Sequence, residues 1–214
     1  MLRICYGGTF DPVHNGHLAV AAAAHAALSA DVLLLPAADP PHRPPTGASA
    51  VQRSQMLHLA VRELPFCRVD ERELQRDGPS YSVDTLKEIR REIGPEQPLA
   101  WLLGADSFRG LASWHHWREL FDLAHFVVAI RPGHELGQLD EPLRSVCAGR
   151  WTQDAQALRS AAFGGLYRLV LPPRPESATA IRRSLAAGEG DLGWLPPVVA
   201  EYIREQGLYR SQGI

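Results

Sequence analysis

The hydrophobic positions of this chain alternate between short continuous apolar runs and longer stretches with helical spacing. The short runs predict strands at 2–6, 31–36, 66–69, 99–103 and 126–130, and the longer stretches predict helices at 17–28, 51–63 and 82–92. Alternation of this kind is typical of an α/β domain, a doubly wound parallel sheet with helices on both faces. We therefore expect ligands to bind beyond the carboxyl ends of the strands.

The stretches between these elements do not divide the chain. Pro-rich segments at 36–45 and 172–175 predict loops with restricted backbones. The hydrophobic pattern is weakest at 133–165, where only a helix near 142–148 is expected. Whether this stretch forms a protein–protein interface stays an open question. Since no repeat or linker appears in 214 residues, residues 1–214 are expected to form a single domain.

Composition and charge narrow the class of protein. The chain is 45% hydrophobic and 21% charged with a formal net charge of −2, so no global charge recruits nucleic acid or an anionic membrane. Its three cysteines, Cys5, Cys67 and Cys147, suit neither a disulfide framework nor a zinc ligand set. The apolar run at 18–28 is too short to span a membrane, which takes roughly 20 residues. We expect a cytoplasmic protein without a targeting segment.

The sharpest motif follows the first predicted strand, where residues 7–18 read GGTFDPVHNGHL. Paired glycines let a backbone approach a triphosphate, and their N–H groups can point at its oxygens. Asn15 and Gly16 suit a helix start, whose dipole favours a bound anion. His14 and His17 are three positions apart, so both are expected to meet phosphate oxygens from one side.

A metal site is the main alternative for this histidine pair, and two surface histidines are another. No HExxH pattern is present, and Asp11 with the two histidines makes a poor closed metal site beside glycines that suit phosphate. The phosphate interpretation fits the strand before the motif and the helix after it, so we expect no metal ligands in the protein itself.

Residues 7–18 resemble the GGTFDPxHxGH signature of the HxGH nucleotidyltransferase superfamily, which implies a Rossmann-like fold. Within that group, positions from about Leu2 to Tyr209 resemble the bacterial nicotinate-nucleotide adenylyltransferases. Five further stretches carry the narrower resemblance: PPHR at 40–43, SYSVDTL at 80–86, GAD at 104–106, SWHHW at 113–117 and SATAIR at 177–182.

The resemblance implies transfer of AMP from ATP to nicotinic acid mononucleotide, giving nicotinic acid adenine dinucleotide and pyrophosphate in NAD biosynthesis. Mg²⁺ is expected to arrive with ATP. The expected partners are the two substrates, and a homo-oligomer is left open. Rival interpretations are another acceptor, such as nicotinamide mononucleotide, phosphopantetheine or a cytidylyltransferase substrate, and a non-catalytic ATP sensor.

The resemblance also assigns residues to two parts of a site. Catalysis is expected from His14, His17 and Arg182. The expected ATP-binding residues are Gly7, Gly8, Thr9, Phe10, His14, Gly16, His17, Gly104, Asp106, Ser177, Thr179 and Arg182. The expected nicotinate-nucleotide-binding residues are Arg43, Ser82, Asp84, Thr85, Trp114 and His115.

Several of these residues have physical roles with plain structural alternatives. Ser177 or Thr179 can cap a helix whose Arg182 makes paired hydrogen bonds to phosphate, or that helix can be an ordinary surface helix. Asp106, after an apolar strand, can accept ribose hydroxyls or cap a helix. Trp114 is expected to stack on a cationic pyridinium ring, whereas Trp117 is expected to pack in the core.

The sequence departs from the family pattern at three positions. Arg43 stands where the family usually has lysine, Ser82 where it has threonine, and Glu176 where it has an apolar residue. A carboxylate turned toward a triphosphate would repel it, so we expect Glu176 to face solvent.

Overall fold

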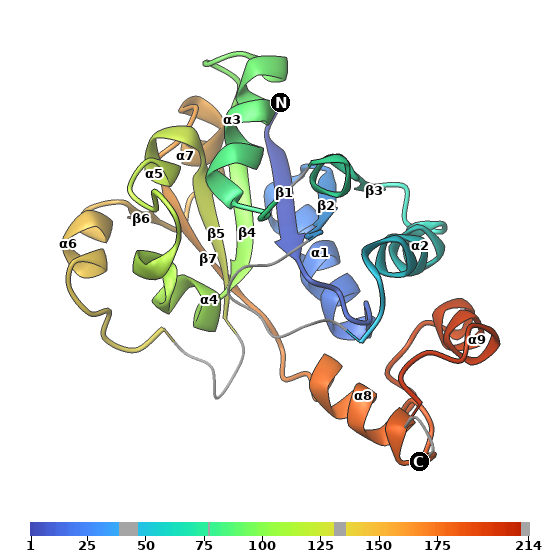
Figure 1. Ribbon diagram of the computed structural model, residues 1–214. Helices are drawn as coiled ribbons and strands as arrows, with labels where there is room; N and C mark the ends of the chain where they lie inside the picture. The colour runs from blue at the N-terminus through green and yellow to red at the C-terminus, as the bar shows by residue number, and fades with distance from the viewer. Residues whose placement is uncertain (39–46, 77, 131–135, 211–214) are drawn as a thin grey trace.

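The computed structural model describes residues 1–38, 47–76, 78–130 and 136–210 (Figure 1). Their centre is a seven-stranded sheet in the order β3-β2-β1-β4-β5-β7-β6, in which every pair of neighbours is parallel. The strands are β1 (Arg3–Gly8), β2 (Val32–Pro36), β3 (Cys67–Val69), β4 (Leu99–Gly104), β5 (His125–Ile130), β6 (Trp151–Thr152) and β7 (Leu166–Val170). The expected doubly wound parallel sheet is confirmed.

Helices follow most of the strands. They are α1 (Asn15–Leu28), α2 (Ala50–Val61), α3 (Ser82–Ile93), α4 (Ala105–Arg109), α5 (Leu120–Leu123), α6 (Leu143–Cys147), α7 (Ala155–Ser160), α8 (Ala178–Ala186) and α9 (Pro197–Glu205). Two short 3₁₀ turns lie at Arg72–Gln75 and Leu111–Ser113. The eight elements with clear hydrophobic patterns are therefore confirmed, with shifts of one or two residues at their ends.

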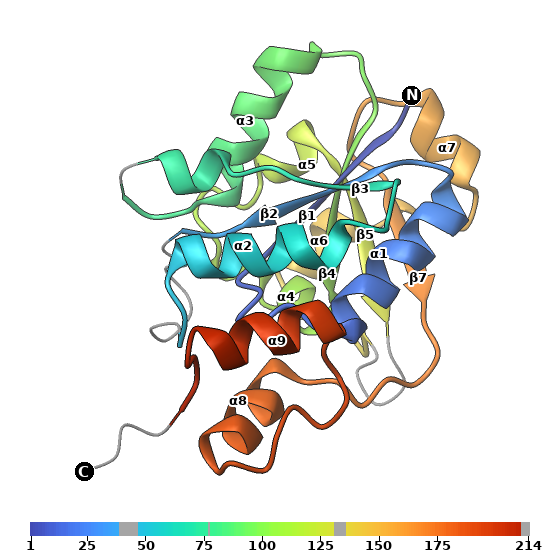
Figure 2. The same ribbon diagram turned by 90° about the vertical axis from the view of Figure 1, so that its right-hand side faces the viewer.

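The helices cover both faces of the sheet, as an all-parallel sheet requires. Alternate residues of β1 serve the two layers: Ile4 and Tyr6 belong to the core under α1 and α2, whereas Cys5 belongs to the core under α3 and α4. Figure 2 shows α3 and α5 on one side of the sheet and α1, α2 and α9 on the other. Strands buried on both faces explain the continuous apolar runs in the sequence.

Four helices and strands in the second half were not expected from the hydrophobic pattern: α5, β6, α7 and β7. In β7 only Leu166 and Leu169 are buried, and Val170 is 75% exposed, so the strand carries no continuous apolar run. The strand β6 is only two residues long. Elements this short or this exposed near a sheet edge leave little periodicity for sequence analysis to detect. The expected helix near 142–148 is confirmed as α6.

The strand order reverses at β1, which lies between β2 and β4. A crevice opens beyond the carboxyl ends of two strands at such a switch point. In Figure 1 the arrow of β1 points toward the region where α8 lies.

The C-terminal segment packs back onto the layer formed by α1 and α2. Val199 and Ile203 of α9 are buried in the core that also holds α1 and α2. The carbonyl of Trp194 accepts a 2.9 Å hydrogen bond from the backbone N–H of Asn15, where α1 begins. None of the helices in the described ranges combines the length and apolar character that crossing a membrane requires.

Candidate active site

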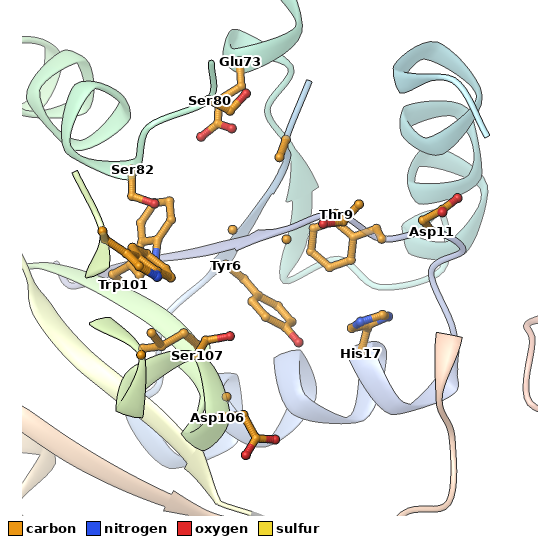
Figure 3. A pocket seen from close by; sticks show the side chains of 18 of the residues that line it. Tyr6, Thr9, Asp11, His17, Glu73, Ser80, Ser82, Trp101, Asp106 and Ser107 are labelled. Atoms are coloured by element: carbon orange, nitrogen blue, oxygen red, sulfur yellow. The ribbon is translucent and has the colours of Figure 1, made fainter. Parts of the chain in front are cut away.

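A cavity of about 620 Å³ opens at the carboxyl ends of β1 and β4. It takes its walls from the segment after β1, the start of α4, the start of α3 and one face of α8. Figure 3 shows Ser82 and Trp101 on one side of the cavity and His17 and Asp11 on the other. Its size suits a small-molecule ligand, for which pockets of about 300–1,000 Å³ are usual.

The two glycines of the first motif line the cavity, and packing requires both of them. A Cβ on Gly7 would lie 2.4 Å from the ring of Trp101 on β4. A Cβ on Gly8 would lie 2.9 Å from the ring of Phe10. Trp101 is a lining residue that sequence analysis missed, because the register that sets β4 beside β1 brings its ring against Gly7. The glycines therefore admit two aromatic rings, while their backbones remain paired with the neighbouring strand β2.

A fully buried arginine fixes the loops behind this wall. The guanidinium of Arg53, on α2, donates to the carbonyl of Thr9 at 2.6 Å and to the carbonyls of Ala37 and Ala38 at 2.7 and 3.1 Å. Burial lowers the pKa of Arg53, opposed by the charge of Asp11 nearby. The loops after β1 and β2 thus turn these three carbonyl oxygens toward a cation, which keeps them from repelling an anionic ligand.

The two histidines of the motif do not occupy equivalent places. Their rings stack with centroids 3.7 Å apart, but His17 lines the cavity and His14 is 5% exposed beneath it. The backbone N–H of His14 donates to Nδ1 of His17 at 3.3 Å. With Nδ1 as acceptor, the ring proton lies on Nε2, which makes that nitrogen a hydrogen-bond donor. The two histidines therefore do not face the cavity side by side. His17 presents a hydrogen-bond donor to it, and the buried ring of His14 packs behind the ring of His17.

The helix α8 brings a cation to the same cavity from the far end of the chain. Ser177 caps it by accepting a 3.4 Å hydrogen bond from the N–H of Ala180. Thr179 and Arg182 line the cavity, whereas Ser177 is not among the lining residues. Of the two expected caps, Ser177 is therefore confirmed and Thr179 is left facing the ligand space.

Aromatic side chains form the opposite end of the cavity. Trp114, His115 and Tyr81 line it, and the rings of Tyr81 and His115 stack with centroids 4.4 Å apart. Trp117 is 7% exposed and packs edge-on against Phe121. The expectation that Trp117 packs in the core is confirmed. The stacking of Trp114 on a ligand stays a prediction. Ser82 lines this end of the cavity and is the first residue of α3. Among the described residues, no side chain caps the backbone N–H groups in the first turn of that helix.

Other expected residues lie outside the lining. Thr85 is fully buried, and its hydroxyl donates to the carboxylate of Glu73 at 2.7 Å. Asp84 stands in the first turn of α3, and Gly16 is packed against the ring of His14. Arg43 lies outside the described residues.

Glu73 is a lining residue that the sequence did not single out, and burial raises the pKa of its carboxyl, opposed by the hydrogen bonds from Thr85 and Ser80. Its position in a short 3₁₀ turn gave no pattern by which to find it.

The strand β4 delivers Gly104 and Asp106 to the cavity. Gly104 occupies the cap position of α4, and Asp106 lies in the first turn, where its carboxylate pairs with Arg109. The alternative in which Asp106 itself caps the helix is therefore wrong. Within the described parts of the chain, no group of three or more His, Cys, Asp or Glu side chains is arranged to hold a metal ion.

The prediction that Glu176 faces solvent is wrong. Its side chain is 7% exposed, and a Cβ placed on Gly16 would lie 3.2 Å from its Cβ. The carboxylate forms a 2.6 Å ion pair with Arg174, which compensates the charge and permits burial beside the start of α1. An acidic residue here is therefore neutralised by a neighbour rather than turned away.

Comparison with known proteins gives concordant matches. The family described as cytidylyltransferase-like matches residues 5–184. A protein of Stenotrophomonas maltophilia with the name "Probable nicotinate-nucleotide adenylyltransferase" is 54% identical over 216 residues, which cover 98% of this chain and 97% of that protein. A protein of Xylella fastidiosa with the same name is 50% identical over 213 residues, covering 97% and 96% of the two chains.

A solved structure shares the fold at much lower sequence identity. It is the Plasmodium falciparum nicotinic acid mononucleotide adenylyltransferase complexed with NaAD, with a TM-score of 0.69, 17% identity and 97% coverage of each chain. At this identity the likeness supports the architecture alone.

Proposed function

This chain belongs to the cytidylyltransferase-like family and, within it, to the nicotinate-nucleotide adenylyltransferases, and on that premise we propose that it transfers AMP from ATP to nicotinic acid mononucleotide. The products are nicotinic acid adenine dinucleotide and pyrophosphate. The observation that carries the proposal is a single cavity with hydrogen-bond donors for phosphate at one end and aromatic rings at the other.

The phosphate end suits direct in-line displacement. An oxygen of the mononucleotide's 5′-phosphate attacks the α-phosphorus of ATP, a new P–O bond forms, and the bond to the pyrophosphate oxygen breaks. The attacking phosphate is already ionised, so no general base is needed. Nε2 of His17 and the guanidinium of Arg182 would stabilise charge on the α-phosphate and the leaving group, and Gly7 and Gly8 line the cavity beside them.

The aromatic end suits the pyridine ring of the acceptor. The exposed face of Trp114 would stack on a cationic nicotinate ring. Backbone N–H groups near Ser82 and His115 would hold the nicotinate carboxylate, since the first turn of α3 has free donors at this point. Asp106 would accept hydrogen bonds from a ribose.

We propose that Mg²⁺ enters with ATP and is held by phosphate oxygens and water. The carboxylates that line the cavity already have partners: Tyr209 donates to Asp11, Thr85 donates to Glu73, and Arg109 pairs with Asp106. When bound, the ion would neutralise phosphate charge during the displacement.

The proposal is tested by pyrophosphate release from ATP and Mg²⁺ with nicotinic acid mononucleotide and nicotinamide mononucleotide compared by kcat/KM. We expect strong preference for the acid, because only the acid offers a carboxylate to the donors near Ser82 and His115. Equal kcat/KM for the two mononucleotides would contradict the proposed contacts to the carboxylate. If neither mononucleotide gave pyrophosphate release, the proposed acceptor would be contradicted.

His17→Ala locates the activity in this cavity. It should lower kcat by about 10²-fold, the usual effect of removing a preorganised donor to developing charge. The matched control is His58→Ala, since His58 lies on α2 outside the cavity and contacts Glu71 at the surface. Near-normal turnover in His17→Ala would contradict the phosphate role.

A further inference from the structure

The carboxylate of Asp11 is the meeting point of three distant segments. Its Oδ2 accepts from the N–H of Gly47 at 2.8 Å, and its Oδ1 accepts from the N–H of Ala48 at 3.2 Å and from the hydroxyl of Tyr209 at 2.7 Å. The side chain is 6% exposed. These donors fix the carboxylate in orientation and spread its charge over the start of α2 and the C-terminal segment.

Arg182 approaches the same residue without forming a close ion pair. Its Nη1 donates to the backbone carbonyl of Asp11 at 2.6 Å, but lies 3.8 Å from the carboxylate Oδ2. A direct charged hydrogen bond would be about 2.7–2.9 Å long. The guanidinium therefore remains at the cavity wall, hydrogen-bonded to a carbonyl and without a direct hydrogen bond to the adjacent carboxylate.

The chain holds Tyr209 in place with some local strain. Its backbone has φ of 61°, in the left-handed region that aromatic residues rarely adopt. Its ring packs over Gly47, where a Cβ would lie 2.8 Å from two ring atoms. Burial, together with the Asp11 carboxylate, raises the pKa of Tyr209, so the hydroxyl retains the proton that it donates. Strain retained at a residue that donates to a cavity-lining carboxylate indicates a constraint beyond packing.

We infer that Tyr209 is a positioning residue for nucleotide binding: its hydroxyl occupies the Asp11 carboxylate and so keeps Arg182 available to the phosphates of ATP. Without that hydroxyl, Oδ1 keeps only the longer hydrogen bond from Ala48, and the less restrained carboxylate can turn to form a direct ion pair with Arg182. That pair competes with ATP for the guanidinium. The inference rests on the proposed function in one respect, the role of Arg182 as a phosphate ligand.

Tyr209→Phe tests this, because it keeps the ring over Gly47 and removes only the hydroxyl. We expect KM for ATP to rise about tenfold, the scale of one hydrogen bond to a charged group, with kcat changed little. The dissociation constant of ATP alone, measured by calorimetry, should rise by the same factor. Tyr202→Phe on α9 is the matched control and should change neither quantity.

A double-mutant cycle separates positioning from a general structural role. In an Arg182→Gln background there is no guanidinium to capture, so Tyr209→Phe should change kcat/KM for ATP by less than about twofold. An equal loss in both backgrounds, or an unchanged KM in Tyr209→Phe alone, would overturn the inference. A wild-type protein that binds ATP but releases no pyrophosphate would instead contradict the proposed function, while the calorimetric comparison still decides the role of Tyr209.

Discussion

Trp114 and Trp117 lie three positions apart in one short segment, yet their surroundings differ. Trp114 is half-buried at the cavity wall, whereas Trp117 is packed among the residues between α3 and α5. The sequence pattern alone does not distinguish the two tryptophans. The backbone turns the ring of Trp114 toward the cavity and the ring of Trp117 into the core. Replacing each with alanine should therefore affect a different property, ligand binding for Trp114 and stability for Trp117.

Trp114→Ala should reduce kcat/KM for the mononucleotide by about tenfold, because a ring stacked on a desolvated cation contributes roughly 1–2 kcal/mol. Its thermal unfolding should change little. Trp117→Ala should lower the free energy of unfolding by about 3–5 kcal/mol, the usual effect of deleting a large buried aromatic ring. Parallel steady-state kinetics and denaturant unfolding would check both. A Trp114→Ala protein with normal kinetics would exclude the stacking role.

At the scale of elements, the helix α8 presents Arg182 to the cavity, and Ser177 determines where that helix begins. The Ser177 hydroxyl satisfies one backbone N–H that would otherwise have no partner in the helix. Since Ser177 is not among the lining residues, its contribution to ATP binding is expected to pass through the helix rather than through direct contact.

Ser177→Ala should therefore lower the free energy of unfolding by about 1 kcal/mol and raise KM for ATP modestly. Ser177→Asn should restore both, because asparagine is an equally good cap. Urea unfolding and ATP kinetics on the two variants make the comparison. If Asn impaired ATP binding as much as Ala while restoring stability, Ser177 would contact the nucleotide directly.

The elements also differ in how far the sequence could predict them. The strands β1, β2, β4 and β5 are buried on both faces, so their apolar runs were clear. The strand β7 is half-exposed and β6 has two residues, and neither was expected. A run of apolar residues marks a strand in the sequence only where the strand is long enough and buried on both faces.

For the whole molecule, stability should depend on the protonation of His125. This side chain is 1% exposed and joins β5 to the segment before β7: the N–H of Gly165 donates to Nδ1 at 2.9 Å, and Nε2 lies 2.9 Å from the carbonyl of Ala161. The geometry requires a neutral ring with its proton on Nε2. Burial lowers the pKa of His125, although the Ala161 carbonyl opposes this.

Because the folded pKa lies below the ordinary value of 6.5, the unfolded chain takes up this proton first. The contribution of neutral His125 to the free energy of unfolding is fully present above pH 6.5, and it is lost as the pH falls toward the pKa of the folded state. Thermal unfolding of wild type between about pH 8 and about pH 5 should show this decline, and His125→Gln should show less of it. His58→Gln is the control. An unchanged pH slope in His125→Gln would assign the decline to other groups.

The sequence by itself determined the α/β class, the strand, loop and helix around residues 7–18, and the chemical types available for phosphate and pyridine. These follow from adjacent residues, whose spacing already fixes local geometry. It predicted two equivalent histidines and a solvent-facing Glu176, whereas His14 lies beneath His17 and Glu176 is buried beside Arg174. Only the tertiary structure decided that Trp101 meets Gly7 and that Tyr209 reaches Asp11 across 198 positions. Contacts between distant segments depend on strand order and packing, which local periodicity does not specify.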